Sequence, residues 1–261
     1  MLGIWAHPDD EAFLSAGLMA EARAAGQRVV CVTATLGGRG TSEPERWPPE
    51  RLARVRAYEL RASLAVLGVT EHYLLGIPDG DCADQPLEAM VDRLATIVDD
   101  VRPDTIVTFG PDGLTGHSDH QAVSRWATAV RARAAADARL LYATITGEFI
   151  DEWQHVYDRL RVFLTDGLPA RTPSAVLGLQ LRLDDELSDR KLVSLRAQAT
   201  QTAALVALLG EDTMRDWCSV ESFTDAESAV FDRAWGTWRP DASTASRPKS
   251  AAPAAGHDAV S

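Results

Sequence analysis

The sequence predicts an α/β fold with a mostly parallel sheet flanked by helices and a less regular C-terminal portion. The first half alternates short apolar runs with stretches of helical periodicity, as strand–helix–strand units do. The chain has 261 residues, of which 46% are hydrophobic, enough to bury a large core. Regular alternation weakens beyond residue 147. We expect a single domain over residues 1–238.

The first strand–helix–strand unit occupies residues 2–34. Residues 2–6 form a short apolar run typical of a buried strand. Residues 11–25 have helical periodicity, with Gly17 on the apolar face, where a small residue allows close packing against the sheet. Residues 29–34 are rich in Val and Thr and predict a second strand.

A long segment without periodicity follows, at residues 35–49. It contains three glycines and three prolines, so no regular element is expected. A loop of this length inside a compact domain usually forms part of a site or is disordered.

The next elements continue the alternation of strands and helices. We expect strands at residues 71–77, 105–109 and 140–146, and helices at residues 50–67, 86–101 and 119–136. A Pro-Asp-Gly-Asp turn follows the first of these strands, and a glycine-rich loop at 110–116 follows the second.

The C-terminal portion gives weaker signals. Residues 156–164 and 175–183 predict strands, and residues 189–209 predict one long helix. Residues 239–261 are rich in Ala, Ser, Pro and Asp and predict a disordered tail.

The charge balance argues against several classes of partner. With 26 Lys and Arg against 38 Asp and Glu, the net charge is −12, which disfavours nucleic acid and anionic membranes. No apolar run approaches the roughly 20 residues of a membrane-spanning helix, and no signal-peptide pattern is present. The three cysteines are widely spaced and predict buried, reduced thiols. We expect a cytoplasmic protein without membrane insertion.

The first cluster of reactive side chains is Ala-His-Pro-Asp-Asp-Glu at residues 6–11, where the first strand ends. Ligands of parallel α/β sheets bind beyond the carboxyl ends of strands. Grouped carboxylates stay charged near one another only when a cation compensates them. The alternative is that Asp9 or Asp10 merely caps the helix and His7 is a surface histidine.

The second cluster is Gly-His-Ser-Asp-His at residues 116–120, again after a strand and a glycine-rich loop. His117 and His120 are three residues apart and face one direction if they lie in a first helical turn. Alone, this cluster fits a capped helix start equally well. Together the two clusters offer two imidazoles and a carboxylate, a common open zinc site that activates water for hydrolysis.

These residues resemble the signatures of the PIG-L/LmbE-type zinc-dependent de-N-acetylase family. Residues 6–11 match its (A/V)HPDDE motif, and residues 116–120 match its GH-x-DH motif. Weaker similarities cover the helix at residues 56–69, the turn at 77–80, and Lys191 with the Thr-Gln pair at 200–201. The resemblance extends over residues 1–225 and implies a Rossmann-like fold.

The resemblance also implies roles for individual residues. The Zn²⁺ ligands would be His7, Asp10 and His120. Asp9 would be the general base that deprotonates the zinc-bound water. His117 would stabilise the oxyanion or protonate the leaving amine, with Asp119 as its orienting partner.

Substrate contacts are implied less directly. Arg56 and Asp79 match positions that bind sugar hydroxyls in relatives. The alternative for Arg56 is a helix-surface pair with Glu59, and for Asp79 a plain turn residue.

Three positions depart from the family pattern. Gly38 stands where an acidic residue is common, Gln198 where a histidine is common, and Thr115 where thiol-sugar deacetylases have a catalytic tyrosine. What replaces the phenol of that tyrosine is left open.

The expected function is therefore removal of the N-acetyl group from a small amino-sugar or glycoconjugate. An amidase that cleaves a larger acyl group from a thiol-sugar conjugate or an acylated natural product is the alternative. Two further hypotheses carry less weight: a sugar-binding module without activity, because both motifs are intact, and a magnesium phosphohydrolase, because imidazole ligands favour zinc. The sequence does not indicate an oligomeric state.

Overall fold

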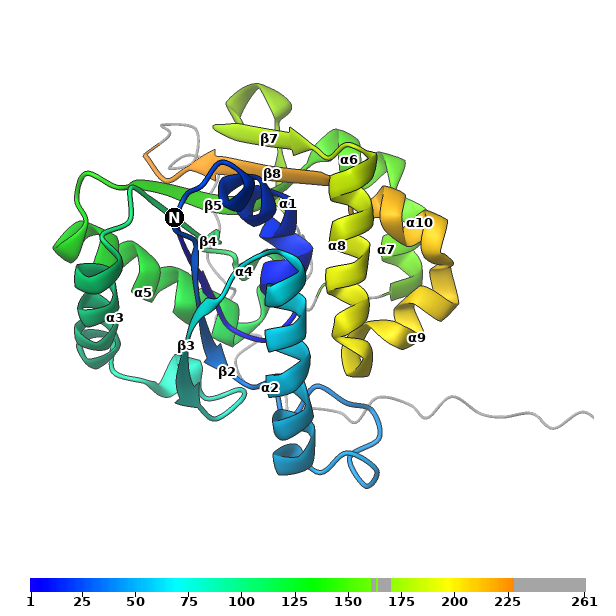
Figure 1. Cartoon of the computed structure of the whole chain (residues 1–261), viewed down its shortest axis with the longest axis horizontal. Helices are drawn as coiled ribbons and strands as arrows, with labels where there is room; N and C mark the ends of the chain where they lie inside the picture. The colour runs from blue at the N-terminus through cyan, green and yellow to red at the C-terminus, as the bar shows by residue number, and fades with distance from the viewer. Residues whose placement is uncertain (161–162, 164–169, 228–261) are drawn as a thin grey trace, which may run out of the picture.

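The computed structural model describes residues 1–160, 163 and 170–227. In this part of the chain, eight strands form a mixed sheet in the order β3-β2-β1-β4-β5-β8-β7, with β6 paired to β5 (Figure 1). The expected domain limit at residue 238 and the expected tail at 239–261 lie outside the described residues.

The strands of the sheet are short. They are β1 Leu2–Trp5, β2 Val30–Thr35, β3 Glu71–Ile77, β4 Thr105–Phe109, β5 Arg139–Thr146, β6 Arg171–Thr172, β7 Leu179–Arg182 and β8 Val220–Asp225. The helices are α1 Asp10–Ala24, α2 Pro49–Val66, α3 Leu87–Val101, α4 Gly113–Gly116, α5 Ser118–Ala134, α6 Gly147–Glu152, α7 Gln154–Leu160, α8 Asp185–Ala197, α9 Ala199–Leu209 and α10 Glu211–Trp217.

The first five strands are parallel, as the sequence predicts, and the strand order reverses at β1. Leu2 of β1 is in register with Val30 of β2 on one side and with Ile106 of β4 on the other. Chain connections therefore leave β1 in one direction along the sheet and β4 in the other. Such a switch point leaves a crevice at the carboxyl ends of the two central strands, where ligands of α/β proteins bind.

Helices cover both faces of this sheet. In Figure 1, α1, α2 and α8 pack together on one face, and α3 packs beside α5 on the other. The core between them is apolar, and the indole of Trp5 meets the ring of Phe109 edge-on at 5.0 Å. This packing fixes the ends of β1 and β4 relative to each other.

The C-terminal portion differs from the sequence prediction in several places. Residues 154–160 form helix α7, whereas a strand was expected from 156, and the strand expected over 175–183 is limited to β7. The single helix expected over 189–209 is two helices, α8 and α9, broken at Gln198. The buried amide of Gln198 donates to Glu11 at 2.6 Å, so a tertiary hydrogen bond stabilises the break.

The sheet also ends in two antiparallel strands that the sequence analysis missed in part. β8 pairs antiparallel with β5 and with β7. β8 reads Val-Glu-Ser-Phe-Thr-Asp, and neither its periodicity nor its composition marks it as a strand of the core.

A buried ion pair joins this edge of the sheet to the middle of α1. Lys191 and Glu221 are 2.7 Å apart and almost completely buried. The Glu221 carboxylate accepts from the backbone N–H groups of Gly17 and Leu18, and the Lys191 ammonium donates to the carbonyl of Phe13. The pair thus anchors α1 through its backbone.

Gly17 allows a close approach to α1, but the residue that approaches is Leu183 rather than a residue of the sheet. A Cβ at this position would lie 2.2 Å from Leu183, in the segment that precedes α8. The close packing predicted for Gly17 is therefore against the C-terminal portion of the chain.

The structure also bears on the predictions for the cysteines and for membrane-spanning helices. Cys31, Cys82 and Cys218 are all buried and unpaired, as expected for reduced thiols. Among the described residues, no helix has the length and apolarity needed to cross a membrane.

We expect Lys191→Met to lower the free energy of unfolding by about 3–5 kcal/mol, because it leaves the Glu221 carboxylate charged and buried. Urea denaturation followed by circular dichroism measures this loss. Arg190→Met is the matched control, since Arg190 pairs with Glu186 on the surface and such pairs contribute about 1 kcal/mol or less. Equal losses in the two variants would contradict the structural role of the Lys191–Glu221 pair.

Candidate active site

The two clusters singled out in the sequence meet at the carboxyl ends of β1 and β4. His7 Nδ1 lies 3.1 Å from His120 Nε2 and 3.7 Å from an oxygen of Asp10. The other oxygen of Asp10 lies 3.5 Å from His120 Nε2. These three side chains come from the loop after β1, the first residue of α1 and the first turn of α5.

The spacing of these donors fits a tetrahedral metal ion. A zinc ion with bonds of about 2.0–2.2 Å separates its ligand atoms by roughly 3.3–3.6 Å. The two imidazole nitrogens are 3.1 Å apart, close to this range, and each lies within 3.7 Å of one of the two oxygens of Asp10. Without a cation, two imidazole nitrogens and a carboxylate would have little reason to converge in a buried position.

Further contacts orient the two imidazoles as metal ligands require. The Nε2 of His7 lies 3.1 Å from both Asp79 and Asp119, and the Nδ1 of His120 lies 3.0 Å from the carbonyl of Gly113. The ring of Phe109 stacks on His120 at 4.1 Å. A carboxylate or carbonyl on the far nitrogen fixes the tautomer of a ligating histidine and increases its basicity.

Two other groups of donors lie within 4.8 Å of one another: His7 with His117 and His120, and His7 with Asp79 and Asp119. The carboxylates of the second group are already engaged. Asp119 accepts from the backbone of Gly80 and Cys82, and Asp79 accepts from the backbone of Arg39. They are better placed to support His7 than to bind a cation themselves.

The position of Asp119 corrects one expectation. The resemblance implied that Asp119 orients His117, but its carboxylate contacts His7 instead. Only the backbone N–H of Asp119 reaches His117, donating to Nδ1 at 3.1 Å. Since Asp119 is the first-turn residue of α5, its N–H is free of intrahelical partners and can hold the imidazole.

Charge in the site favours a cation at His7. Burial alone would lower the pKa of His7, but hydrogen bonds to Asp119 and Asp79 and the charge of Asp10 raise it to about 10. Burial lowers the pKa of His120, which stays neutral. A metal ion would replace the proton of His7 and be compensated by the same carboxylates.

Asp9 adopts a backbone conformation that separates it from Asp10. Its φ is +100°, in a region that costs a non-glycine residue about 1–3 kcal/mol. Its N–H donates to Glu11, and its carboxylate lies 3.4 Å from the guanidinium of Arg56. Burial raises the pKa of Asp9 to about 7, against the opposing charge of Arg56. Neighbouring aspartates thus occupy different environments.

Arg56 is buried and supports the loops around Asp9. Its guanidinium donates to the carbonyl oxygens of Pro8 and Gly37. Gly37 has a φ of +59°, and a Cβ there would lie 1.9 Å from the guanidinium, so only glycine allows this approach. The alternative pairing of Arg56 with Glu59 is not formed, because Glu59 accepts from Thr200.

The sequence analysis gave no role to Glu11, which the structure places beneath the site. Glu11 is buried and accepts from the N–H of Asp9, from Gln198 and from Ser63. The sequence feature that could have indicated this role is the position of Glu11 as the last residue of the first cluster. Gln198, which stands where relatives often have histidine, is therefore part of the support of Asp9.

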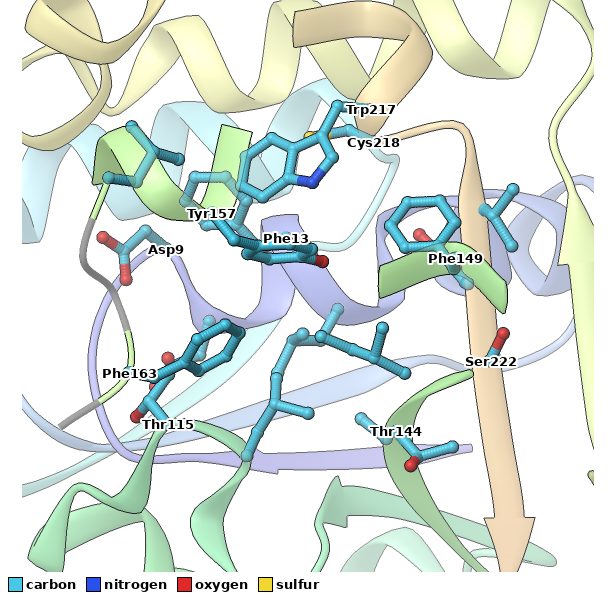
Figure 2. Close-up of a pocket in the computed structure, with 18 of the residues that line it drawn as sticks. Asp9, Phe13, Thr115, Thr144, Phe149, Tyr157, Phe163, Trp217, Cys218 and Ser222 are labelled. Carbon is cyan, nitrogen blue, oxygen red and sulfur yellow. The ribbon is translucent and has the colours of Figure 1, made fainter. Parts of the chain in front are cut away.

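Two cavities open at this site and share Asp9, Asp10, His120 and Gln201. One, of 640 Å³, is polar, and we call it the polar cavity. Its lining includes Arg39, Arg56, Asp79, His117 and Ser118. The other, of 410 Å³, is mostly apolar, and we call it the apolar cavity (Figure 2). Thr115, at the position of the missing tyrosine, lines the apolar cavity.

Known proteins resemble this chain in sequence. The family model described as GlcNAc-PI de-N-acetylase, PIG-L, matches residues 2–131. The 1D-myo-inositol 2-acetamido-2-deoxy-alpha-D-glucopyranoside deacetylase of Corynebacterium glutamicum (strain R) is 31% identical over 225 residues, which are 77% of this chain and 74% of the relative. The protein of the same name from Saccharomonospora viridis is 32% identical over 77% of this chain and 84% of the relative.

Solved structures share the fold at lower identity. N,N'-diacetylchitobiose deacetylase from Pyrococcus horikoshii superposes with a TM-score of 0.57 at 20% identity, over 86% of this chain and 82% of that chain. GalB, the 4-carboxy-2-hydroxymuconate hydratase of Pseudomonas putida KT2440, gives 0.58 at 16% identity, over 87% and 95%. Because a hydratase shares the fold, the fold alone does not define the reaction.

We expect two variants to lose metal affinity to different degrees and a third to keep it. His120→Ala removes an expected ligand and should abolish stoichiometric metal binding, whereas Asp119→Asn alters a contact that supports His7 and should weaken binding by about 10–100-fold. His72→Ala, a change at a histidine on β3 that contacts Thr33, is the control and should bind metal normally. Metal analysis and calorimetric titration of the metal-depleted proteins measure the series. Full retention of metal by His120→Ala would contradict the ligand assignment.

Proposed function

The chain belongs to the PIG-L family of GlcNAc-PI de-N-acetylases, and on this basis we propose that it is a zinc-dependent hydrolase that removes the N-acetyl group from an amino-sugar conjugate. The observation that supports the proposal is the convergence of His7, Asp10 and His120 beside a polar cavity, with the two imidazole nitrogens 3.1 Å apart and each near an oxygen of Asp10. A small glycoconjugate substrate and a cytoplasmic location are parts of the same proposal.

Zinc is the metal that suits this donor set. Two imidazoles and one carboxylate form a common open zinc site, whereas magnesium prefers oxygen ligands alone. When bound, zinc polarises the amide carbonyl and lowers the pKa of a coordinated water toward neutrality. His7, Asp10 and His120 would hold the ion in this proposal.

Asp9 is the general base in the proposed mechanism. Its carboxylate lines both cavities and takes a proton from the water that attacks the amide carbon. A base is most effective when its pKa lies near the working pH, and burial brings the pKa of Asp9 to about 7. Its contact with Arg56 keeps the carboxylate from turning away.

His117 is the hydrogen-bond donor to the oxyanion in the proposed mechanism. Its Nδ1 accepts from the backbone of Asp119, so in the neutral imidazole the proton is carried by Nε2. This Nε2–H can donate to the developing oxyanion, and the proton that Asp9 took from water passes to the leaving amine. The products are acetate and a free amino sugar.

The polar cavity suits the sugar portion of the substrate. Arg39, Arg56, Asp79 and Ser118 supply charged and hydroxyl groups along its walls, and such groups hydrogen-bond sugar hydroxyls. In this proposal Arg56 and Asp79 contact substrate in addition to holding Asp9 and His7. The curated relatives act, by name, on an N-acetylated glucosamine joined to inositol, which makes that conjugate the first substrate to test.

We expect Asp9→Asn to lower kcat by about 10²–10⁴-fold while metal content stays unchanged, because the amide cannot accept the proton. Release of free amine from N-acetylglucosamine and from its inositol conjugate measures the loss. Glu21→Gln, at an exposed position of the same helix, is the control and should retain the wild-type rate. Wild-type turnover by Asp9→Asn, or turnover by the metal-free enzyme, would contradict the mechanism.

A further inference from the structure

The apolar cavity adjoins the proposed catalytic centre but differs from the polar cavity in chemistry. Aromatic and aliphatic side chains of several helices form its walls: Phe13, Leu14, Phe149, Tyr157, Leu205 and Trp217. The ring of Trp217 packs against those of Phe13 and Tyr157, at 6.2 and 5.8 Å. Figure 2 shows these rings together, with Asp9 and Thr115 at one side of the cavity and Thr144 and Ser222 at the other.

The charged residues that line the apolar cavity, Asp9, Asp10 and Glu221, all have another role in the structure. Asp9 and Asp10 belong to the catalytic centre that both cavities share. Glu221 also lines the cavity, but its carboxylate is held by Lys191 and by two backbone N–H groups of α1. A ligand in the interior would therefore meet a surface that favours hydrocarbon.

The chemistry of the two cavities indicates which part of a substrate enters each of them. An amide has two substituents at its carbonyl carbon, the amine nitrogen and the acyl chain. The sugar is attached to the nitrogen, and its hydroxyl groups fit the polar cavity, whose lining includes Arg39, Asp79 and Ser118. With the sugar there, the acyl chain points into the apolar cavity.

The volume of the apolar cavity exceeds what an acetyl group needs. A methyl group is about the size of a water molecule, whose share of liquid volume is roughly 30 Å³. The cavity measures 410 Å³, within the range of sites that bind whole small molecules. An acetylated substrate would leave most of this apolar surface unfilled.

We propose that the apolar cavity is an acyl-chain site and that the preferred substrates carry medium-length linear acyl groups, of about six to ten carbons, on the amino-sugar nitrogen. This inference rests on the proposed hydrolase activity and names its substrate class. The attacking water adds to the amide carbon, the C–N bond breaks, the nitrogen takes a proton, and the products are a fatty acid and the amino sugar. Each buried methylene contributes to binding through removal of apolar surface from water.

The test is a series of N-acyl glucosamines from acetyl to decanoyl, each below its aggregation concentration, assayed for amine release by the wild-type holoenzyme. We expect kcat/KM to rise by about two- to fourfold per methylene, and at least about 50-fold from acetyl to octanoyl, before it levels off. The octyl glycoside of N-acetylglucosamine places the same chain on the sugar side and should show no such gain. A flat or falling series, with acetyl still hydrolysed, overturns the acyl-chain site and leaves the proposed function standing. Hydrolysis of none of the compounds contradicts both.

A variant at the side of the apolar cavity away from Asp9 tests whether this cavity causes the preference for long acyl chains. Ser222→Leu places bulk among the cavity residues and should lower the octanoyl-to-acetyl ratio of kcat/KM at least about tenfold, whereas Thr96→Leu, on the exposed surface of α3, should leave the ratio unchanged. An unchanged octanoyl-to-acetyl ratio in Ser222→Leu overturns the placement of the acyl chain in the apolar cavity.

Binding can be measured without turnover. In calorimetric titrations of the metal-loaded Asp9→Asn variant, which turns over too slowly to interfere, N-octanoylglucosamine should bind more tightly than N-acetylglucosamine and with a negative heat-capacity change. Equal affinities for the two compounds count against the proposal.

Discussion

The parallel pairing of β1 with β4 is the constraint from which the candidate site follows. The two strands are more than a hundred residues apart in sequence, yet their backbone hydrogen bonds bring their carboxyl ends together. His7 leaves one strand and His120 follows the other, so the sheet itself sets the distance between the two imidazoles. A site built in this way needs no flexible segment to assemble it, and its geometry is as rigid as the core around Trp5 and Phe109.

Electrostatics explains why so many carboxylates are concentrated here. Asp10, Asp79 and Asp119 all lie within 4 Å of His7, and each would repel the others without a positive charge between them. Backbone N–H groups from the turn after β3 neutralise part of this charge at Asp119. The arrangement costs folding free energy, and a bound cation would offset this cost, as in the metal centre that we propose.

The N-terminal half of the fold and the members of the site were predictable from sequence, whereas their contacts were not. Alternating periodicity identified the strands that carry the two clusters, residue types at the strand ends identified the clusters, and the family resemblance singled out His7, Asp10 and His120 within them. Sequence spacing could not show that Asp119 supports His7, because that contact depends on where β4 lies in the sheet. It also could not show the helix break at Gln198 or the strand character of β8, since tertiary hydrogen bonds override local preference there.

The ion pair that anchors α1 also ties this helix to a strand that lies far from it in the sequence. α1 begins at Asp10, and its middle is held by Lys191 and Glu221, so the segment that carries a candidate ligand is braced by residues about two hundred positions later. During synthesis on the ribosome, α1 emerges long before β8. The first turn of α1 therefore lacks this support until residue 221 has been made.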